Sequence, residues 1–304
     1  MARQNDNVIP IINKKVLFAC IIMIAIGLVL MFSLPKTNVI LDDNNVNTHS
    51  GSDYVQLTTM NEGRIEKIIV HKSDLLFNTE IIDSKDNIHP KSMIIEKKPE
   101  LADFYKQVSS ANASDAVFVY PIFTQGAYGE HGFYNYYDKE CGAECLTIAI
   151  PSGFTPTYSS SMGISKVLPL LNYSRITDVD IDKNPDILKK YHRVIILHNE
   201  YVTKKEFDAI TGHPHVIYLY PNALYAEVRT NYTDNTFTLV RGHGYPDSSI
   251  GNGFGWKFDN SNFEYDTACK NMTLATIPNG KMLNCYPAYR AIFDKSFLEM
   301  IKES

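Results

Sequence analysis

Short apolar runs alternate with amphipathic stretches from about residue 115 to the C-terminus. The apolar runs predict buried strands at residues 116–123, 145–150, 193–198, 215–221 and 236–242. Apolar residues at helical spacing between them predict short helices, and Ser or Thr can cap two of these, as at Thr203. This alternation predicts an α/β fold with a mainly parallel sheet. Two further strands, at 271–277 and 281–287, should be antiparallel, and a helix at 295–303 should end the chain.

The longest apolar segment lies near the N-terminus. Residues 16–34, VLFACIIMIAIGLVLMFSL, carry no charge, and as a helix they can cross a hydrocarbon core of about 30 Å. Lys14 and Lys15 precede the segment, so the positive-inside rule places a tail of residues 1–15 in the cytoplasm. A cleaved signal peptide is the alternative, but the run is long for one and no small-x-small cleavage site follows. We predict a signal-anchor: a single-pass transmembrane helix over residues 16–35 in the cell membrane, contacting membrane lipid, with the rest of the chain extracytoplasmic.

Two regions are expected outside the membrane. Residues 36–100 alternate polar runs with short apolar clusters and show no sustained period, which indicates a stalk or partly ordered linker with one or two strands. Residues 101–304 hold the regular pattern and form the predicted extracytoplasmic α/β domain.

Composition and charge exclude one class of partner and agree with an external domain. The 304 residues are 44% hydrophobic with a net charge of −5, and no basic stretch is patterned to bind nucleic acid. Four Asn-X-Ser/Thr sequons are candidates for glycosylation if the domain is extracellular. They lie at Asn112, Asn172, Asn231 and Asn271.

Four cysteines lie outside the predicted anchor, at Cys141, Cys145, Cys269 and Cys285. An even number in an oxidising space indicates two disulfides, for which three pairings exist. Closeness in sequence favours Cys141 with Cys145 and Cys269 with Cys285. The alternative, one zinc site built from all four, has a spacing unlike that of a zinc ribbon.

Polar side chains follow the predicted strands where each strand ends. His198 and Glu200 come after one strand, Asn222 after another and His243 after a third. Because the crevice at the carboxyl ends of parallel strands is the usual place for chemistry, these groups should gather at one edge. His198 and Glu200 could converge on one ion or one proton. The alternative is a strand-end histidine bonded to backbone and a glutamate that helps to cap the next helix.

Two further segments carry candidate groups. Residues 120–137, YPIFTQGAYGEHGFYNYY, are predicted to be a flexible glycine-rich loop with Tyr128, Glu130 and His131, or else an aromatic loop over the core. Tyr158 precedes a predicted helix at the same carboxyl edge. The turn at Asn222, expected to be a strand–turn–helix, has no Ser or Cys where a nucleophile elbow would carry one. Phosphate-loop and His-Glu-x-x-His motifs are also missing from the sequence.

The segment KYHRVIILHNEYVTKKEFDAI...HVIYLYPNALYAEV resembles the C-terminal domain of the large (beta) subunit of N,N-dimethylformamidase. The resemblance covers about residues 115–260 and implies a three-layer, glutamine-amidotransferase-like (flavodoxin-like) fold. PIFTQGAYG and TPTYSSS resemble the family's two tyrosine segments, although the second lacks the family's Arg. It implies a mononuclear iron with Tyr128, Tyr158 and Glu200 as ligands and His198 as general base or supporting group. Phenolate and carboxylate oxygens suit ferric iron.

Function is therefore expected to be one of three kinds. The first is a membrane-anchored, iron-dependent hydrolase of amide or similar C–N bonds that acts on a small molecule. The second is a non-catalytic ectodomain that binds a ligand, glycan or envelope protein on the same scaffold. The third is another hydrolase at this edge that uses His243, or His131 with Glu130. The Asn-rich anchored chain with its sequons is also similar to archaeal surface proteins.

Overall fold

The computed structural model describes residues 53–61, 64–82, 92–154 and 161–304. The chain divides into two units, 1–52 and 53–304, and every described residue belongs to the second. The predicted anchor and Tyr158 lie outside the described residues. Within the described ranges, no helix combines the length and apolar character needed to cross a membrane.

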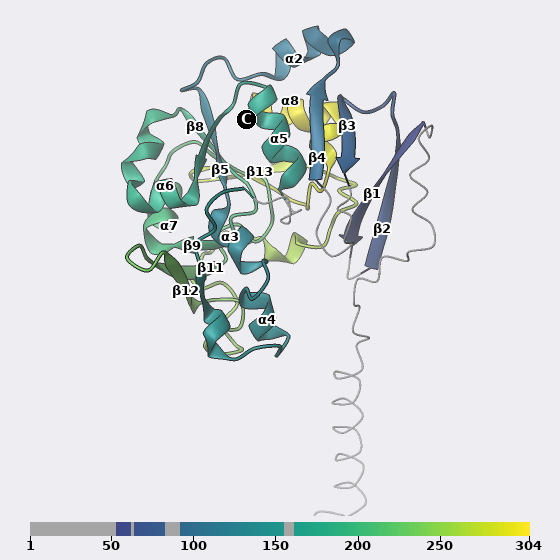
Figure 1. The fold of residues 1–304 in the computed structure, drawn as a ribbon. Coiled ribbons are helices and arrows are strands. Elements are labelled where there is room, and N and C mark those ends of the chain that lie inside the picture. Colours follow the sequence, from purple (N-terminus) through teal and green to yellow (C-terminus); the bar gives the residue numbers. More distant parts are fainter. Residues whose placement is uncertain (1–52, 62–63, 83–91, 155–160) are drawn as a thin grey trace, which may run out of the picture. The chain divides into compact units, whose positions relative to one another are not determined.

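A six-stranded sheet forms the centre of the domain (Figure 1). Five of its strands are parallel and the sixth, β13, pairs antiparallel with β14 at one edge. The inner strands read as continuous apolar runs because both faces of the sheet are covered. In order across the sheet the strands are β13 (Leu274–Ile277), β14 (Gly280–Leu283), β10 (Val216–Tyr218), β8 (Arg193–Ile196), β5 (Ala116–Tyr120) and β7 (Ser174–Thr177).

Helices cover the two faces of this sheet. Phe118 packs into one hydrophobic cluster with residues of α5 and α8, whereas Val117 and Val119 point to the other face and pack with residues of α6 and α7. Figure 1 shows these two pairs of helices on opposite sides of the sheet. The predicted α/β class is thereby confirmed. The helices are α2 (Ala102–Val108), α5 (Met162–Leu170) and α8 (Lys295–Glu303) on the first face, and α6 (Asp178–Lys183), η3 (Pro185–Lys190) and α7 (Lys204–Thr211) on the second.

A second, four-stranded sheet adjoins the end of β8. Its strand β9 (Tyr201–Thr203) begins directly after Glu200, so residues 197–200 connect the two sheets. Phe237 and Leu239 of β12 face the core while the intervening residues are partly exposed, which is the alternation of a sheet with one buried face. The order is β6 (Thr147–Ala149), β12 (Thr236–Arg241), β11 (Ala226–Asn231) and β9, with only β9 and β11 parallel.

Two hairpins precede the α/β part. They are β1 (Tyr54–Asn61) with β2 (Arg64–His71), and β3 (Phe77–Ile82) with β4 (Ser92–Lys97). Phe77 and Met93 belong to the main hydrophobic core, and the Leu76 amide donates to the Ile292 carbonyl at 2.7 Å. The described part of the region predicted as a stalk thus holds four strands, more than the one or two expected, because its short apolar clusters pack against the C-terminal part of the domain.

The segment 120–137 differs from the predicted flexible loop. It forms two short helices, α3 (Ile122–Ala127) and α4 (Phe133–Tyr137). Phe123 and Phe133 are fully buried, and both rings contact Phe237 of the second sheet. A Cβ on Gly132 would lie 2.2 Å from the Ala127 carbonyl oxygen, so this glycine permits close packing of the chain on itself.

Two other predicted elements are corrected by the structure. The segment after β10 is a turn followed by strand β11, and the expected helix is absent at these described residues; Asn222 and Leu224 adopt positive φ values of 65° and 59°. The strand expected at 145–150 is β6 at the edge of the second sheet, where Thr147 is exposed.

The described residues also form four short 3₁₀ turns outside the two sheets and their covering helices. These are η1 (Pro99–Leu101), η2 (Ala143–Leu146), η4 (Ser261–Phe263) and η5 (Arg290–Ile292).

Candidate functional site

The strand order fixes where a crevice should form. Numbered along the chain as strands 1 to 5, β5, β7, β8, β10 and β14 lie in the order 2-1-3-4-5. The chain therefore leaves β5 and β8 in opposite directions across the sheet, which makes their carboxyl ends the switch point where open α/β sheets bind ligands. β5 leads into α3 and Tyr128, and β8 leads into His198 and Glu200.

Glu200 is the centre of a polar cluster at this point. Its side chain is fully buried. The Tyr128 hydroxyl donates to Glu200 Oε2 at 2.8 Å, and the Tyr134 hydroxyl lies 3.4 Å from Oε1. Two imidazoles complete the set, with His198 Nε2 at 3.8 Å from Oε2 and His243 Nε2 at 3.4 Å from Oε1. We call these five residues the Glu200 cluster.

The two tyrosine hydroxyls and the His243 imidazole form a continuous hydrogen-bonded chain that ends at Glu200. Tyr134 lies 2.8 Å from the Tyr128 oxygen and 3.1 Å from His243 Nε2. A phenol has a single proton to donate. If Tyr128 donates to Glu200 and Tyr134 donates to Tyr128, then His243 must present an N–H at Nε2. A proton can then pass from the partly exposed His243 to the buried carboxylate through two phenols.

Burial controls the charge of the carboxyl. It raises the pKa of Glu200 to about 8, while hydrogen bonds from Tyr128 and Tyr134 lower it and the charge of Glu264 raises it further. Among the described residues, no Lys or Arg forms an ion pair with Glu200. The site thus holds a buried carboxyl that binds a proton near neutral pH, and a cation could take that proton's place.

Burial also keeps both histidines neutral. It lowers the pKa of His198 to about 3 and lowers the pKa of His243 as well. Neutral imidazoles can accept a proton or donate a lone pair to a metal ion. An ionised Glu200 beside them would stabilise the imidazolium form and raise both pKa values.

Backbone contacts from three segments hold the cluster in place. The His198 amide donates to Ser161 Oγ at 3.2 Å, and the Tyr201 amide donates to Thr124 Oγ1 at 3.1 Å. The Glu200 carbonyl accepts hydrogen bonds from the amides of Tyr225 and Ala226, both at 2.9 Å. The loop 197–201 is therefore fixed by α3, by the start of α5 and by the turn after β10.

Aromatic rings surround His243. Tyr137 stacks on it with ring centroids 4.9 Å apart, and Tyr134 and Tyr225 meet it edge-on at 5.5 and 5.9 Å. Tyr134 and Tyr137 were not among the site residues expected from the sequence. A signal was present in FYNYY, where the first and last tyrosines are three residues apart and so share one face of a short helix.

Several buried polar atoms near the cluster have no hydrogen-bond partner. They are Tyr137 Oη, Asn199 Nδ2 and Asn222 Oδ1. Asn199 adjoins Glu200 in the chain, and the Asn199 carbonyl accepts the amide of Leu224 at 2.8 Å, which brings the Asn222 turn beside it. Because buried polar groups are normally paired, such atoms are places where a ligand or water can bind.

The donor set fits a hard metal ion if tyrosine oxygens take part. Nowhere in the described ranges do three or more His, Cys, Asp or Glu side chains gather as a metal-binding group. Two oxygens bound at right angles to one ion at about 2 Å lie about 2.8 Å apart. The Tyr128 and Glu200 oxygens are separated by that distance, 2.8 Å. Two of the three expected iron ligands, Tyr128 and Glu200, therefore meet; Tyr158, the third, lies outside the described residues.

The remaining site candidates have different positions. Glu130 and His131 lie 3.8 Å apart with side chains 86% and 81% exposed, outside the Glu200 cluster. Asn222 is buried beside the turn that contacts Glu200. His243 follows β12 of the second sheet, not a strand of the parallel sheet, yet still reaches Glu200.

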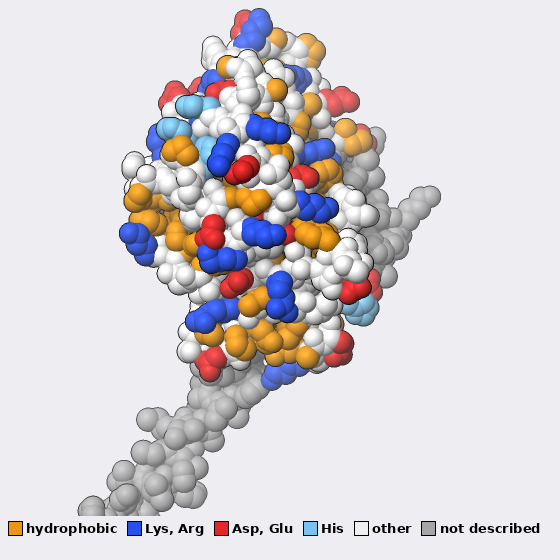
Figure 2. Space-filling model, turned by 90° about the vertical axis from the view of Figure 1, so that its left-hand side faces the viewer, with side chains coloured by type: hydrophobic (Ala, Val, Ile, Leu, Met, Phe, Trp, Pro, Cys, Tyr) orange, Lys and Arg blue, Asp and Glu red, His pale blue; other side chains and the backbone are white. Residues whose placement is uncertain are grey.

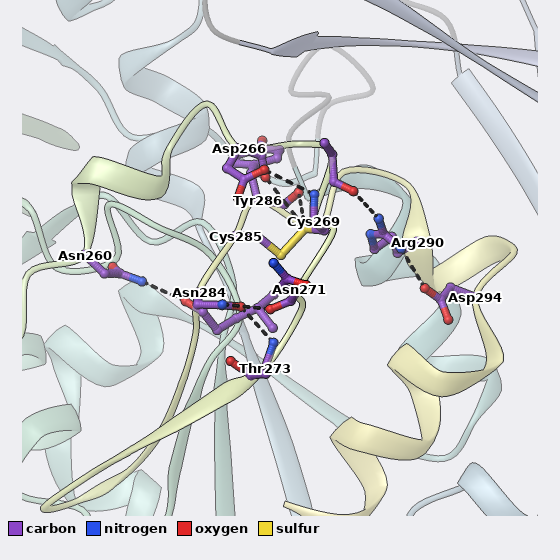
Figure 3. The surroundings of a disulfide bond; sticks show 12 residues. Asn260, Asp266, Cys269, Asn271, Thr273, Asn284, Cys285, Tyr286, Arg290 and Asp294 are labelled. Atoms are coloured by element: carbon purple, nitrogen blue, oxygen red, sulfur yellow. Dashed lines mark hydrogen bonds and ion pairs between the residues drawn. A yellow bond between two sulfur atoms is a disulfide. The ribbon is translucent and has the colours of Figure 1, made fainter.

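Both disulfides favoured from the sequence are present. Cys141 is bonded to Cys145, and Cys269 to Cys285 (Figure 3). The alternative zinc site of four cysteines is thereby excluded.

The four sequon residues lie on the surface of the domain. Asn112, Asn172, Asn231 and Asn271 are all exposed. On the face in Figure 2, Lys and Arg side chains are interspersed with Asp and Glu, and no broad area carries one charge.

Compared with models of known protein families and with curated proteins, the chain matches none of them. Functional conclusions therefore rest on the chemistry of the Glu200 cluster.

Proposed function

We propose that the protein is a membrane-anchored, extracytoplasmic hydrolase of amide or similar C–N bonds, with the Glu200 cluster as its active site and a bound metal ion, iron, as its cofactor. The observation that carries the proposal is the fully buried Glu200, which meets a tyrosine oxygen at 2.8 Å and two imidazoles within 4 Å. Structural carboxylates are normally matched by backbone amides or basic side chains, whereas this one faces groups that transfer protons or bind metals.

The position of the cluster supports the same proposal. The parallel strands have the 2-1-3-4-5 order of flavodoxin-like sheets, which suits the glutamine-amidotransferase-like fold implied by the resemblance to the N,N-dimethylformamidase large subunit. His198, Glu200 and Tyr128 are three of the residues that this resemblance assigns to the site, and they lie together at the switch point. Fold alone does not give activity, so the chemistry of the residues has to carry the assignment.

Glu200 and Tyr128 would hold the metal ion, together with Tyr158. When bound, the ion would act as a Lewis acid toward a carbonyl and lower the pKa of water. The side chains supply the rest. His198 is neutral because it is buried, and its Nε2 lies 3.8 Å from Glu200 Oε2, so it can accept a proton from a water molecule that binds beside the carboxylate. The neutral His243 can relay a proton to the departing nitrogen, through Tyr134 or directly: it releases its Nε2 proton while its partly exposed ring takes up another from solvent.

The test uses the full-length protein purified in detergent. We expect stoichiometric iron by elemental analysis, a visible phenolate-to-iron absorption band, and release of amine from simple formamides and acetamides. Glu200→Gln should remove the metal and lower amide hydrolysis by at least about hundredfold, the scale of losing a catalytic group. Glu130→Gln is the matched control, because Glu130 is exposed outside the cluster, and it should leave both unchanged.

Two results would contradict the proposal. The first is a protein that remains colourless and metal-free after incubation with ferrous or ferric iron. The second is amide hydrolysis that survives Glu200→Gln. A folded, metal-free protein that binds small ligands without turnover would support the alternative, a non-catalytic ectodomain.

A further inference from the structure

A cavity of about 590 Å³ lies at the end of the domain opposite the Glu200 cluster. Its lining comes from β4, from α2 and residues 109–111 after it, from the end of α5 and from α8. Residues 109–111 and 172 precede β5 and β7, so the cavity lies toward the amino ends of the parallel strands, whereas Glu200 follows the carboxyl end of β8. Figure 1 shows α2 and α8, which contact each other, at one end of the domain and α3 and α4 at the other.

Three lysines give this cavity a positive charge. Lys97, Lys106 and Lys302 line it, and its lining, drawn from the described residues, includes no Asp or Glu. Within the described part of the chain, Lys97 and Lys302 form no ion pair. Lys106 lies 3.0 Å from Asp103, but both side chains are exposed, so solvent weakens this pair. The cavity therefore attracts anions, although the chain as a whole has a net charge of −5.

The helix ends around the cavity have other donors, so they do not account for these lysines. Lysines often lie near helix C-termini because they offset the exposed carbonyls. Here, carbonyls in the last turn of α2 accept the Ser109 and Tyr173 hydroxyls at 2.6 and 3.1 Å. At the end of α8, the Lys302 carbonyl accepts the Arg193 guanidinium at 2.8 Å. The lysine ammonium groups are therefore available to a ligand.

The rest of the lining suits an organic molecule. The buried Tyr105 has its ring 5.5 Å from Lys97 Nζ, a cation–π contact that holds this lysine beside the cavity. Ala102 and Ala111 add small apolar surfaces, and the exposed Asn172 adds an amide group. Ammonium groups around a partly apolar hollow of this volume favour a small organic molecule that carries an anionic group.

Hydrogen bonds fix the floor of the cavity. The Ser110 amide donates to the Leu171 carbonyl at 2.9 Å, which joins the end of α2 to the end of α5. The Ser110 hydroxyl lies 3.3 Å from Asp115 Oδ2, and Arg193 pairs with the same oxygen at 2.9 Å. The charge of Asp115 is thus matched by Arg193, and the shape of the floor does not depend on a ligand.

We propose that this cavity is a binding site for the phosphate group of a small organic phosphate ester, held by the ammonium groups of Lys97, Lys106 and Lys302. A phosphate monoester carries nearly two negative charges at neutral pH and several strong acceptor oxygens, so it can bind all three lysines. The Asn172 amide donates to a further oxygen. The site is separate from the Glu200 cluster and does not depend on the proposed hydrolase activity.

The test measures binding to the full-length protein in detergent by isothermal titration calorimetry. The protein is produced without N-glycosylation, because Asn172 is a sequon residue of the cavity, and is kept metal-free so that iron cannot bind phosphate. The probes are glycerol 3-phosphate and glycerol, which share the carbon skeleton and differ in the phosphate group. We expect saturable binding of glycerol 3-phosphate, with glycerol at least about tenfold weaker.

Two double variants separate the cavity from net charge. Lys97→Gln with Lys302→Gln should weaken glycerol 3-phosphate binding by at least about tenfold. The matched control, Lys257→Gln with Lys270→Gln, removes the same charge from two exposed lysines outside the cavity, and it should change binding by less than about twofold.

A second arm distinguishes a soluble ester from a lipid headgroup, since both present the same phosphate. The protein is placed in nanodiscs of phosphatidylcholine, without or with phosphatidic acid, at about 0.15 M salt, where charges more than about 8 Å apart are largely screened. If a lipid phosphate fills the cavity, phosphatidic acid weakens the binding of glycerol 3-phosphate. Unchanged binding assigns the cavity to soluble esters, and both results support the phosphate site.

Four outcomes in detergent would overturn the inference. They are no saturable binding of glycerol 3-phosphate, equal binding of glycerol, undiminished binding to the folded cavity variant, and an equal loss in the matched control. If the cavity variant does not fold, the single variants Lys97→Gln and Lys302→Gln replace it. Each should then weaken glycerol 3-phosphate binding by at least about threefold, and no loss in either would reject the site.

Discussion

Two regions of the domain bury carboxyl groups, and they differ in what faces those groups. One is the Glu200 cluster. The other lies between α6 and α7 and contains Asp178, Asp182 and Glu206, each at most 2% exposed. We call these three residues the α6–α7 cluster. The Glu200 carboxyl contacts tyrosine hydroxyls and two imidazoles. The carboxyls of the α6–α7 cluster instead accept hydrogen bonds from backbone amides and from threonine and tyrosine hydroxyls.

The α6–α7 cluster is built from caps. Asp178 accepts the amides of Phe123 and Val179 at 2.9 and 2.8 Å. Glu206 is the reciprocal member of the capping box at Thr203 and accepts its amide at 2.7 Å. These carboxyls satisfy helix termini and bind neighbouring segments together, which is a structural role. Glu200 differs from these carboxyls because two imidazoles face it, and imidazoles can exchange protons or bind metals near neutral pH.

The largest expected effect separates these roles by mutation. Asp182 accepts hydroxyl hydrogen bonds from Thr203, Thr230 and Tyr232 at 2.7, 2.9 and 2.6 Å. Asp182→Ala leaves three donors unpaired and should lower the free energy of unfolding by about 3–5 kcal/mol. Glu200→Gln should change it by less than about 1 kcal/mol, since a burial cost is removed along with two hydrogen bonds. Chemical denaturation of both variants measures the difference, and equal destabilisation would show that Glu200 is also structural.

The two disulfides should differ in their contribution to stability. Cys269 and Cys285 are 16 residues apart, and Cys141 and Cys145 are 4 apart. Loop-closure entropy predicts a loss of about 3 kcal/mol when the first pair is replaced by serines and about 2 kcal/mol for the second. Chemical denaturation of the two double variants checks this, and the reverse order of stability would contradict it.

A further comparison concerns the dependence of stability on pH. Burial raises the pKa of Asp178 to about 8 from an ordinary value of 3.8, and it raises the pKa of Glu206 too. Between about pH 4 and 8 the native state therefore holds protons that the unfolded chain releases, so stability falls as pH rises through this window. Glu206→Gln should flatten the fall in thermal midpoint, whereas Glu130→Gln should not. A midpoint that rises with pH across this window would contradict the assignment.

Much of the fold could be predicted because its determinants are local. Residues 194–196 and 216–218 are apolar throughout, which is the pattern of strands covered on both faces. Thr203 and Glu206 lie three residues apart, so the start of α7 could be expected from sequence alone. By contrast, α3 and α4 are short and depend on distant packing against Phe237, which no local pattern reveals.

The site could be predicted only in part, because only some of its residues are placed by local sequence patterns. His198 and Glu200 follow a strand directly, and the carboxyl-edge rule locates them. Tyr134 lies 66 residues before Glu200, and its hydroxyl arrives through helix α4, which was predicted as a loop. Contacts between residues so far apart in the sequence depend on the tertiary structure, so they can be identified only once the fold is known.

Anomalous diffraction from crystals of the iron-loaded protein, collected at the iron absorption edge, tests the central claim most directly. We expect one strong peak about 2 Å from both the Tyr128 hydroxyl oxygen and a Glu200 carboxylate oxygen, and no peak in the α6–α7 cluster. Absence of a peak at Glu200, or a peak only among Asp178, Asp182 and Glu206, would contradict it.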